Sequence, residues 1–113
     1  MPKHYLELLK HILEECNYIQ NTITPEISLD DFLNNETLKR AIVRSLEIIG
    51  EATKKIPGDI KYQWKEIEWK SMAGMRDKLI HDYFGINYSI VWDVIENKIP
   101  LLTKQIKSVI NDS

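Results

Sequence analysis

The sequence predicts an all-α fold, a compact up-down bundle of four to five helices. Apolar residues recur at spacings of three and four along most of the chain, as they do on the buried face of an amphipathic helix. Glycine and proline, which interrupt helices, number only four each, and no long stretch alternates apolar and polar residues as a strand would. The length of 113 residues is typical of one domain, so we expect residues 1–113 to form a single helical domain.

The first helix is expected over residues 3–22, whose apolar positions share one face. Pro25 follows them and ends the helix. Ser28 and Asp31 then have the spacing of a capping box, with Ser28 as the N-cap and Asp31 as the reciprocal carboxylate of a short helical turn.

A second long helix is expected over residues 36–55, where apolar residues again form one stripe. Asn34 or Asn35 can cap its start, because an asparagine side chain accepts hydrogen bonds from the first free backbone N–H groups. Pro57 and Gly58 end it.

The second half of the chain is also helical. Residues 59–67 have no clear pattern and are interpreted as one helical turn and a connector. A helix is expected over residues 68–83, stopped by Gly85. Residues 89–110 continue the helical pattern, and Pro100 either begins a new helix there or kinks a long one.

The bulk composition narrows the class of protein. The net charge of −2 gives the whole molecule no electrostatic attraction to nucleic acid, although a local basic cleft is compatible with it. Cys16 is the only cysteine, so no internal disulfide can form, and this fits a reducing compartment. No apolar run approaches the roughly 20 residues of a membrane span. We therefore expect a cytoplasmic protein without membrane contact.

Arg76, His81 and Tyr83 are the residues most suggestive of chemistry. A permanent cation near a side chain that titrates near neutrality suits the binding or cleavage of phosphate esters. At about 100° per residue, however, His81 points about 140° away from Arg76, whereas Tyr83 lies within about 20° of it. Arg76 and His81 can therefore meet only if the helix end reorients, or if two chains of a symmetric dimer bring them together.

Several neighbours could support this site. Asp77 could orient Arg76 or His81, or it could be a solvated carboxylate. Arg44, Glu47 and Glu51 lie along one edge of the second long helix, where they form either an intrahelical ion-pair ladder or a polar face that positions Arg76.

Other polar and aromatic residues carry weaker signals. His4 and His11 share a helix face, but no third ligand has metal-like spacing, so we expect solvent-facing histidines and no metal site. The tryptophans could stack on bases, but Trp69 and Trp92 lie in apolar stripes and are interpreted as core residues.

Two stretches resemble the HepT-like branch of the HEPN superfamily. They are WKSMAGMRDKLIHDYFG at residues 69–85, followed by IVWD at 90–93, and RAIVRSLEIIGEA at 40–52. The resemblance covers residues 28–110 and is weakest at 57–66.

The resemblance implies a HEPN-like bundle that forms a homodimer, with the motif at the dimer cleft. HEPN proteins of this type are metal-independent endoribonucleases that need no cofactor, commonly the toxin of a toxin–antitoxin pair. Arg76 and His81 match the catalytic arginine and histidine of the family. Tyr83 matches the tyrosine that an MntA-type nucleotidyltransferase antitoxin modifies with AMP; without the resemblance, Tyr83 would be interpreted as a half-buried aromatic residue.

Three functions follow as hypotheses. The first is an endoribonuclease toxin that cleaves RNA with Arg76 and His81 and is silenced at Tyr83. The second, suggested by the acidic net charge, is a non-catalytic helical subunit that binds a nucleotidyltransferase. The third is a structural bundle in which Arg76 and His81 are only interface residues.

Overall fold

The helices of the molecule are arranged around one long central helix. The structure is a computed structural model that describes residues 4–81 and 85–112. Seven helices lie in these residues: α1 His4–Thr22, α2 Leu29–Leu33, α3 Glu36–Lys55, α4 Gly58–Gln63, α5 Trp69–His81, α6 Tyr88–Asn97 and α7 Ile99–Asn111. The described part of the chain contains no strand, so the predicted all-α fold is confirmed.

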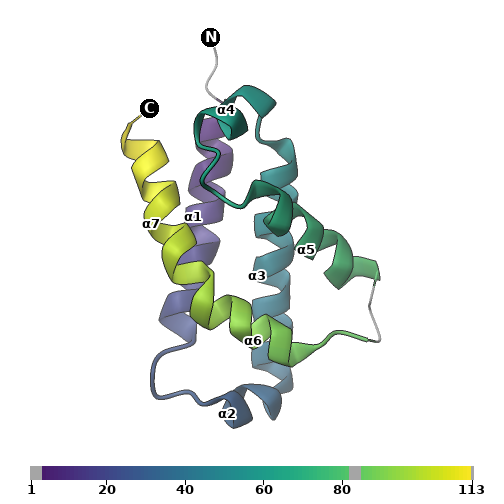
Figure 1. Cartoon of the computed structure of the whole chain (residues 1–113). Coiled ribbons are helices and arrows are strands. Elements are labelled where there is room, and N and C mark those ends of the chain that lie inside the picture. The colour runs from purple at the N-terminus through teal and green to yellow at the C-terminus, as the bar shows by residue number, and fades with distance from the viewer. Residues whose placement is uncertain (1–3, 82–84, 113) are drawn as a thin grey trace.

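Four of the helices pack in the spatial order α7, α1, α3 and α5, so the last helix of the chain packs on the first. Helices α1 and α3 run side by side in opposite directions, and α2 lies at the turn between them (Figure 1). Helix α5 packs on α3, α7 packs on α1, and the short α4 lies at the end of the molecule opposite α2. α3 thus lies between α1 and α5 and holds both in place.

The predicted helix starts are confirmed by their caps. The backbone N–H of Asp31 donates to Ser28 Oγ at 3.1 Å, and the backbone N–H of Ser28 donates to Asp31 Oδ2 at 3.0 Å. Asn35 Oδ1 accepts a hydrogen bond of 2.9 Å from the backbone N–H of Leu38, at the start of α3. These side chains satisfy backbone donors that have no partner within their own helix.

The described part of the chain has more helices than the four to five predicted, for two reasons. The short α2 and α4 form separate helices of 5 and 6 residues. The segment 89–110 is divided at Lys98 into α6 and α7, with Pro100 in the first turn of α7. Proline is tolerated there because the first turn has no intrahelical acceptor for its missing N–H. Helix α5 is described as far as His81, and its predicted last residues, 82 and 83, lie outside the described residues.

The core lies between α3 and its neighbours. Its fully buried side chains come from α1, α2, α3 and α7: Leu9, Ile12, Cys16, Ile19, Phe32, Ile42, Leu46, Ile49, Ile106 and Val109. Burial raises the pKa of the Cys16 thiol to about 11, which keeps it protonated at neutral pH. Trp69 is buried as predicted, and Trp92 is partly buried, with its ring 5.4 Å from that of Phe32.

Candidate functional site

Arg76 lies on the face of α5 that packs against α3. Met72 precedes it by four residues and Leu79 follows by three, and both are buried. Positions three and four apart share a helix face, so the aliphatic base of the Arg76 side chain lies in the same interface as these apolar residues. Its side chain is only 27% exposed although it carries a charge. The packing of α5 therefore fixes the base of the arginine side chain.

Gly50 makes this close approach possible. A Cβ atom at Gly50 would lie 2.0 Å from Arg76 Cβ and 3.0 Å from the carbonyl oxygen of Met72. Two non-bonded carbon atoms are never as close as 2.0 Å, so any larger residue at position 50 would push α5 away from α3. The sequence pattern does not identify Gly50 as a site residue.

Two carboxylates hold the guanidinium of Arg76. Its Nη2 lies 2.9 Å from Glu51 Oε2, across the α3–α5 interface, and its Nη1 donates to Asp77 Oδ1 at 3.2 Å. A guanidinium has five N–H donors in a fixed plane, so these two contacts orient it and leave other donors for a ligand. The structure thus brings together Arg76, Asp77 and Glu51, three of the residues singled out in the sequence.

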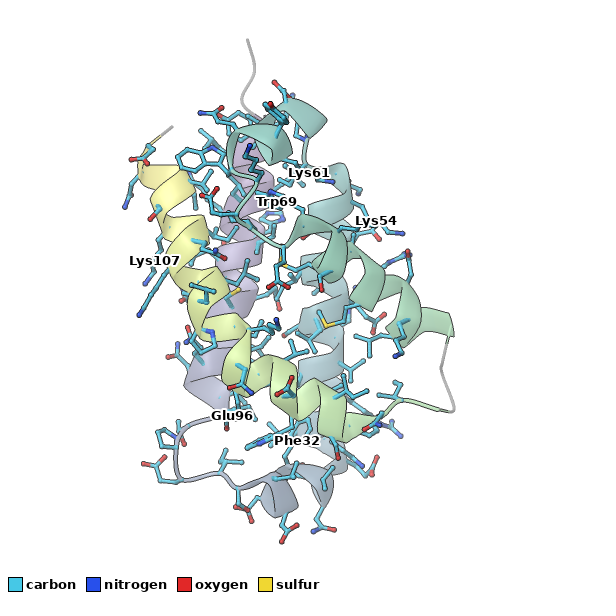
Figure 2. All side chains as sticks on the ribbon, viewed as in Figure 1. Phe32, Lys54, Lys61, Trp69, Glu96 and Lys107 are labelled. Atoms are coloured by element: carbon cyan, nitrogen blue, oxygen red, sulfur yellow. The ribbon has the colours of Figure 1, made fainter. Side chains whose placement is uncertain are left out.

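Lys54 adds a second cation to this group. Lys54 lies next to α5 (Figure 2), and its Nζ forms an ion pair with Asp77 of that helix. The hydrogen bonds from Lys54 and then from Arg76 hold the pKa of Asp77 below its ordinary value. Asp77 is therefore a charged carboxylate at neutral pH, shared by two cations, rather than an isolated solvated group.

A hollow of about 260 Å³ opens beside Arg76. It lies among three helices and is lined by Leu8 and His11 of α1, by Arg44, Glu47, Ile48, Glu51, Ala52 and Lys55 of α3, and by Arg76 of α5. We call it the Arg76 hollow. Its α3 residues follow one another at spacings of three and one, as expected for a single helix face.

The ladder considered for the edge of α3 is not formed as a whole. Glu51 pairs with Lys55 at 3.7 Å and with Arg76 at 2.9 Å. Arg44 and Glu47, in contrast, form no ion pair with any residue in the described ranges, although both line the Arg76 hollow. Their side chains therefore do not form an ion pair with each other.

His11 was predicted to face solvent without a role, and it does lie at the surface. It also lines the Arg76 hollow, on the wall opposite α5. One signal in the sequence could have suggested this position: His11 follows Leu8 by three residues, so it borders the apolar stripe of α1 that packs on α3. Among the described residues, no group of three or more His, Cys, Asp or Glu side chains is placed to hold a metal ion.

Of the remaining motif residues, the backbone of His81 is described. His81 is the last residue of α5, so the helix is continuous from Arg76 to His81, and the two positions are about 140° apart around its axis. The structure does not describe the side chain of His81, and Tyr83 lies outside the described residues.

A larger groove, of about 470 Å³, lies on the other side of α5. Its lining is mostly apolar and comes from α5, α6 and α7, including Met75, Leu79 and Val91. Ile90 and Leu101 border it with half of their surfaces exposed. Exposed apolar side chains around a groove are typical of surfaces that bind other molecules.

Comparisons with known proteins agree on one family. A family model described as "Ribonuclease HepT-like" matches residues 3–109. "Putative RNase TTE0752" of Caldanaerobacter subterraneus subsp. tengcongensis is 49% identical over 109 residues, which cover 96% of this chain and 94% of the relative. "Putative RNase MJ0127" of Methanocaldococcus jannaschii is 44% identical, with 99% and 93% covered.

A third relative has a more specific name. "Probable ribonuclease HepT" of Thermococcus cleftensis is 43% identical over 102 residues, 90% of this chain and 92% of the relative. No solved structure gives a significant match. In the described ranges, each helix is too short or too polar to cross a membrane.

Proposed function

Because the chain belongs to the HepT-like ribonuclease family, we propose that it is a metal-independent endoribonuclease toxin that cleaves RNA with Arg76 and His81. The observation that carries this proposal is the geometry of Arg76. Its guanidinium is partly buried, is oriented by Glu51 and Asp77, and borders a hollow on the protein surface. An oriented guanidinium that retains free donors is suited to a phosphate group.

The reaction requires a proton acceptor, a proton donor and compensation of negative charge. The RNA 2′-hydroxyl attacks the adjacent phosphorus, the bond from phosphorus to the 5′-oxygen breaks, and a 2′,3′-cyclic phosphate forms. His81 takes the proton of the 2′-hydroxyl, or gives a proton to the leaving 5′-oxygen. Arg76 binds the phosphate oxygens, where negative charge increases in the transition state. Glu51 and Asp77 reduce the reorganisation that Arg76 needs, because they already restrict its rotation.

A second copy of the chain completes the site in this proposal. On one continuous helix, positions 76 and 81 are about 140° apart around the axis. A two-fold axis brings Arg76 of one protomer to His81 of the other and supplies two imidazoles to one cleft. One imidazole can then act as the base while the other acts as the acid.

Tyr83 is the proposed site of regulation. An MntA-type nucleotidyltransferase antitoxin transfers AMP from ATP to its hydroxyl group, and pyrophosphate leaves. The added phosphate places negative charge two positions after His81, where it competes with RNA for Arg76 and blocks the cleft. The toxin is then inactive until the AMP is removed or new protein is made.

An RNA cleavage assay tests the catalytic assignment. Purified protein is incubated with RNA in EDTA, beside Arg76→Ala and His81→Ala, with Lys70→Ala as a control that removes an exposed cation from the same helix. We expect a loss of about 10²–10³-fold in kcat for the two motif variants and none for the control. Equal cleavage by wild type and His81→Ala would contradict the assignment.

Co-expression with a nucleotidyltransferase tests the regulation. We expect intact-mass spectrometry to show added AMP on the wild type and none on Tyr83→Phe, and the modified protein to lose RNA cleavage. A stable complex without modification, together with a free protein that does not slow growth, would instead support the non-catalytic binding subunit.

A further inference from the structure

We infer that the Arg76 hollow is a subsite for a second phosphodiester group of the RNA, bound by Arg44 together with His11. This inference rests on the proposed function in one respect, the choice of RNA as the ligand. It concerns a phosphate next to the one that is cleaved, which Arg76 holds.

Arg44 is the main reason for this inference. It is an exposed residue of α3 that lines the hollow, and it forms no ion pair with any residue of the described ranges. None of its guanidinium N–H groups is used by an ion pair to a described residue, so they are available to a ligand. This separates it from Arg76, two of whose donors are already used by Glu51 and Asp77.

The charge of the hollow favours an anion. Three permanent cations line it, Arg44, Lys55 and Arg76, against two carboxylates, Glu47 and Glu51. The hollow is thus locally positive, although the whole chain carries −2. Glu51 also has cations on two sides, with Arg76 at 2.9 Å and Lys55 at 3.7 Å, so its charge is largely compensated.

The geometry favours a phosphate different from the one at Arg76. Arg44 and Glu51 are seven residues apart on α3, about 10 Å along the helix axis, and Arg76 binds at the Glu51 end. Because Glu51 and Asp77 hold the guanidinium of Arg76 at that end of the hollow, the guanidinium groups of Arg44 and Arg76 are placed to bind two phosphates rather than to close on one. Neighbouring phosphates of a flexible single strand can contact one each.

His11 forms the opposite wall of this subsite. It lies on α1 and can donate a ring N–H across the hollow. The volume of about 260 Å³ is below the range of about 300–1,000 Å³ that is usual for whole small-molecule ligands. It suits one phosphate and its waters better than a nucleoside.

Binding of an uncleavable RNA tests the subsite. The probe is a short single-stranded RNA with 2′-O-methyl groups, which lack the attacking hydroxyl. Arg44→Gln is compared with Arg40→Gln, which removes an exposed arginine of α3 one turn away that does not line the hollow. We expect Arg44→Gln to weaken Kd about tenfold and to reduce the salt slope by about 0.7, and Arg40→Gln to change neither.

A second measurement identifies the phosphate. One phosphate at a time in the probe is replaced by a neutral methylphosphonate. In the wild type, one replacement next to the cleavage position should weaken binding about tenfold, and in Arg44→Gln the same replacement should have no further effect. Circular dichroism checks that Arg44→Gln is folded, as expected for an exposed side chain without ion pairs to described residues.

Three outcomes would overturn the subsite: equal effects of Arg44→Gln and Arg40→Gln, additive effects of Arg44→Gln and every methylphosphonate, or an equal loss of affinity for an acidic peptide. The last would mean a general anion site or a protein partner rather than RNA. Because the probe cannot be cleaved, these results do not depend on catalysis. Failure of the proposed function would be recognised separately, by a wild type that leaves ordinary RNA intact.

Discussion

At the scale of single residues, the candidate site is an arginine whose guanidinium is held in place by two carboxylates. Glu51 contacts Arg76 from α3, and Asp77 contacts it from the next position on α5, while Lys54 and Lys55 share these carboxylates. The two carboxylates reduce the rotational freedom of the guanidinium before a ligand binds. They also compete with an anionic ligand for its N–H donors. The two effects can be separated by removing one carboxylate.

We predict that Glu51→Gln lowers kcat about tenfold and leaves the free energy of unfolding nearly unchanged. The physical reason is that Arg76 loses the ion pair that fixes its plane, while the packing of its aliphatic stem remains. The measurement is RNA cleavage under single-turnover conditions, together with urea denaturation.

The control is Glu68→Gln, which removes an exposed carboxylate that pairs with Lys98 at 3.3 Å and does not contact Arg76. It should leave cleavage unchanged. Faster cleavage by Glu51→Gln would show that Glu51 competes with the substrate instead of orienting Arg76.

At the scale of the helices, the contact between α3 and α5 determines where Arg76 lies. Glycine at position 50 lets the two helices approach until their backbones are almost in contact. Buried apolar residues on both sides of Arg76 hold α5 in this register. The stability of this interface and the position of the site are therefore coupled.

We predict that Gly50→Ala destabilises the fold by about 1–3 kcal/mol and lowers RNA cleavage, because the new methyl group overlaps Arg76 Cβ. The matched control is Gly74→Ala on α5, where an added Cβ meets nothing within 4 Å. That substitution should stabilise its helix by about 0.5–1 kcal/mol. Thermal unfolding of both variants gives the comparison, and equal stability would contradict the close approach.

The elements were predictable to different degrees. Helical periodicity located the last residue of α1, and periodicity with the capping asparagine located both ends of α3, because local hydrogen bonds determine these positions. The division between α6 and α7 was less certain, because Pro100 is compatible with both a kink and a new start.

The candidate site was predictable only as a set of residue types. Arg76, Asp77 and Glu51 were identified from the sequence, but their contacts depend on how α5 packs on α3. The roles of Gly50 and His11 depend on neighbours that are 22 or more positions away in the chain, and helix spacing carries no information about such contacts. For His81 and Tyr83, the catalytic and regulatory roles stay predictions.

At the scale of the whole molecule, one protomer leaves two surface features open: the Arg76 hollow and the apolar groove between α5, α6 and α7. They lie on different sides of α5. A second protomer that covers the groove would bury Ile90 and Leu101, whose exposure is unfavourable for a solitary chain. Helix α5 would then belong to both the interface and the site.

Mixing two inactive variants tests whether the site is shared between protomers. Arg76→Ala and His81→Ala, mixed in equal amounts and allowed to exchange subunits, should recover up to about a quarter of wild-type activity, because half of the dimers then contain one intact pair out of two. Each variant alone should remain inactive.

A mixture of wild type with the double variant gives the reference for subunit exchange. No recovery in the first mixture, together with about half of wild-type activity in this reference mixture, would mean that Arg76 and His81 act within one chain; a shared site leaves the reference at about a quarter.

The buried Cys16 also has a consequence for experiments. Only a thiolate reacts rapidly with alkylating reagents, and a side chain without solvent exposure, whose pKa is raised to about 11, reacts only when α1 separates from its neighbours. The rate of thiol labelling in the native protein therefore reports how often α1 separates from the bundle. It can follow α1 on binding of RNA or of a second protomer, without any engineered probe.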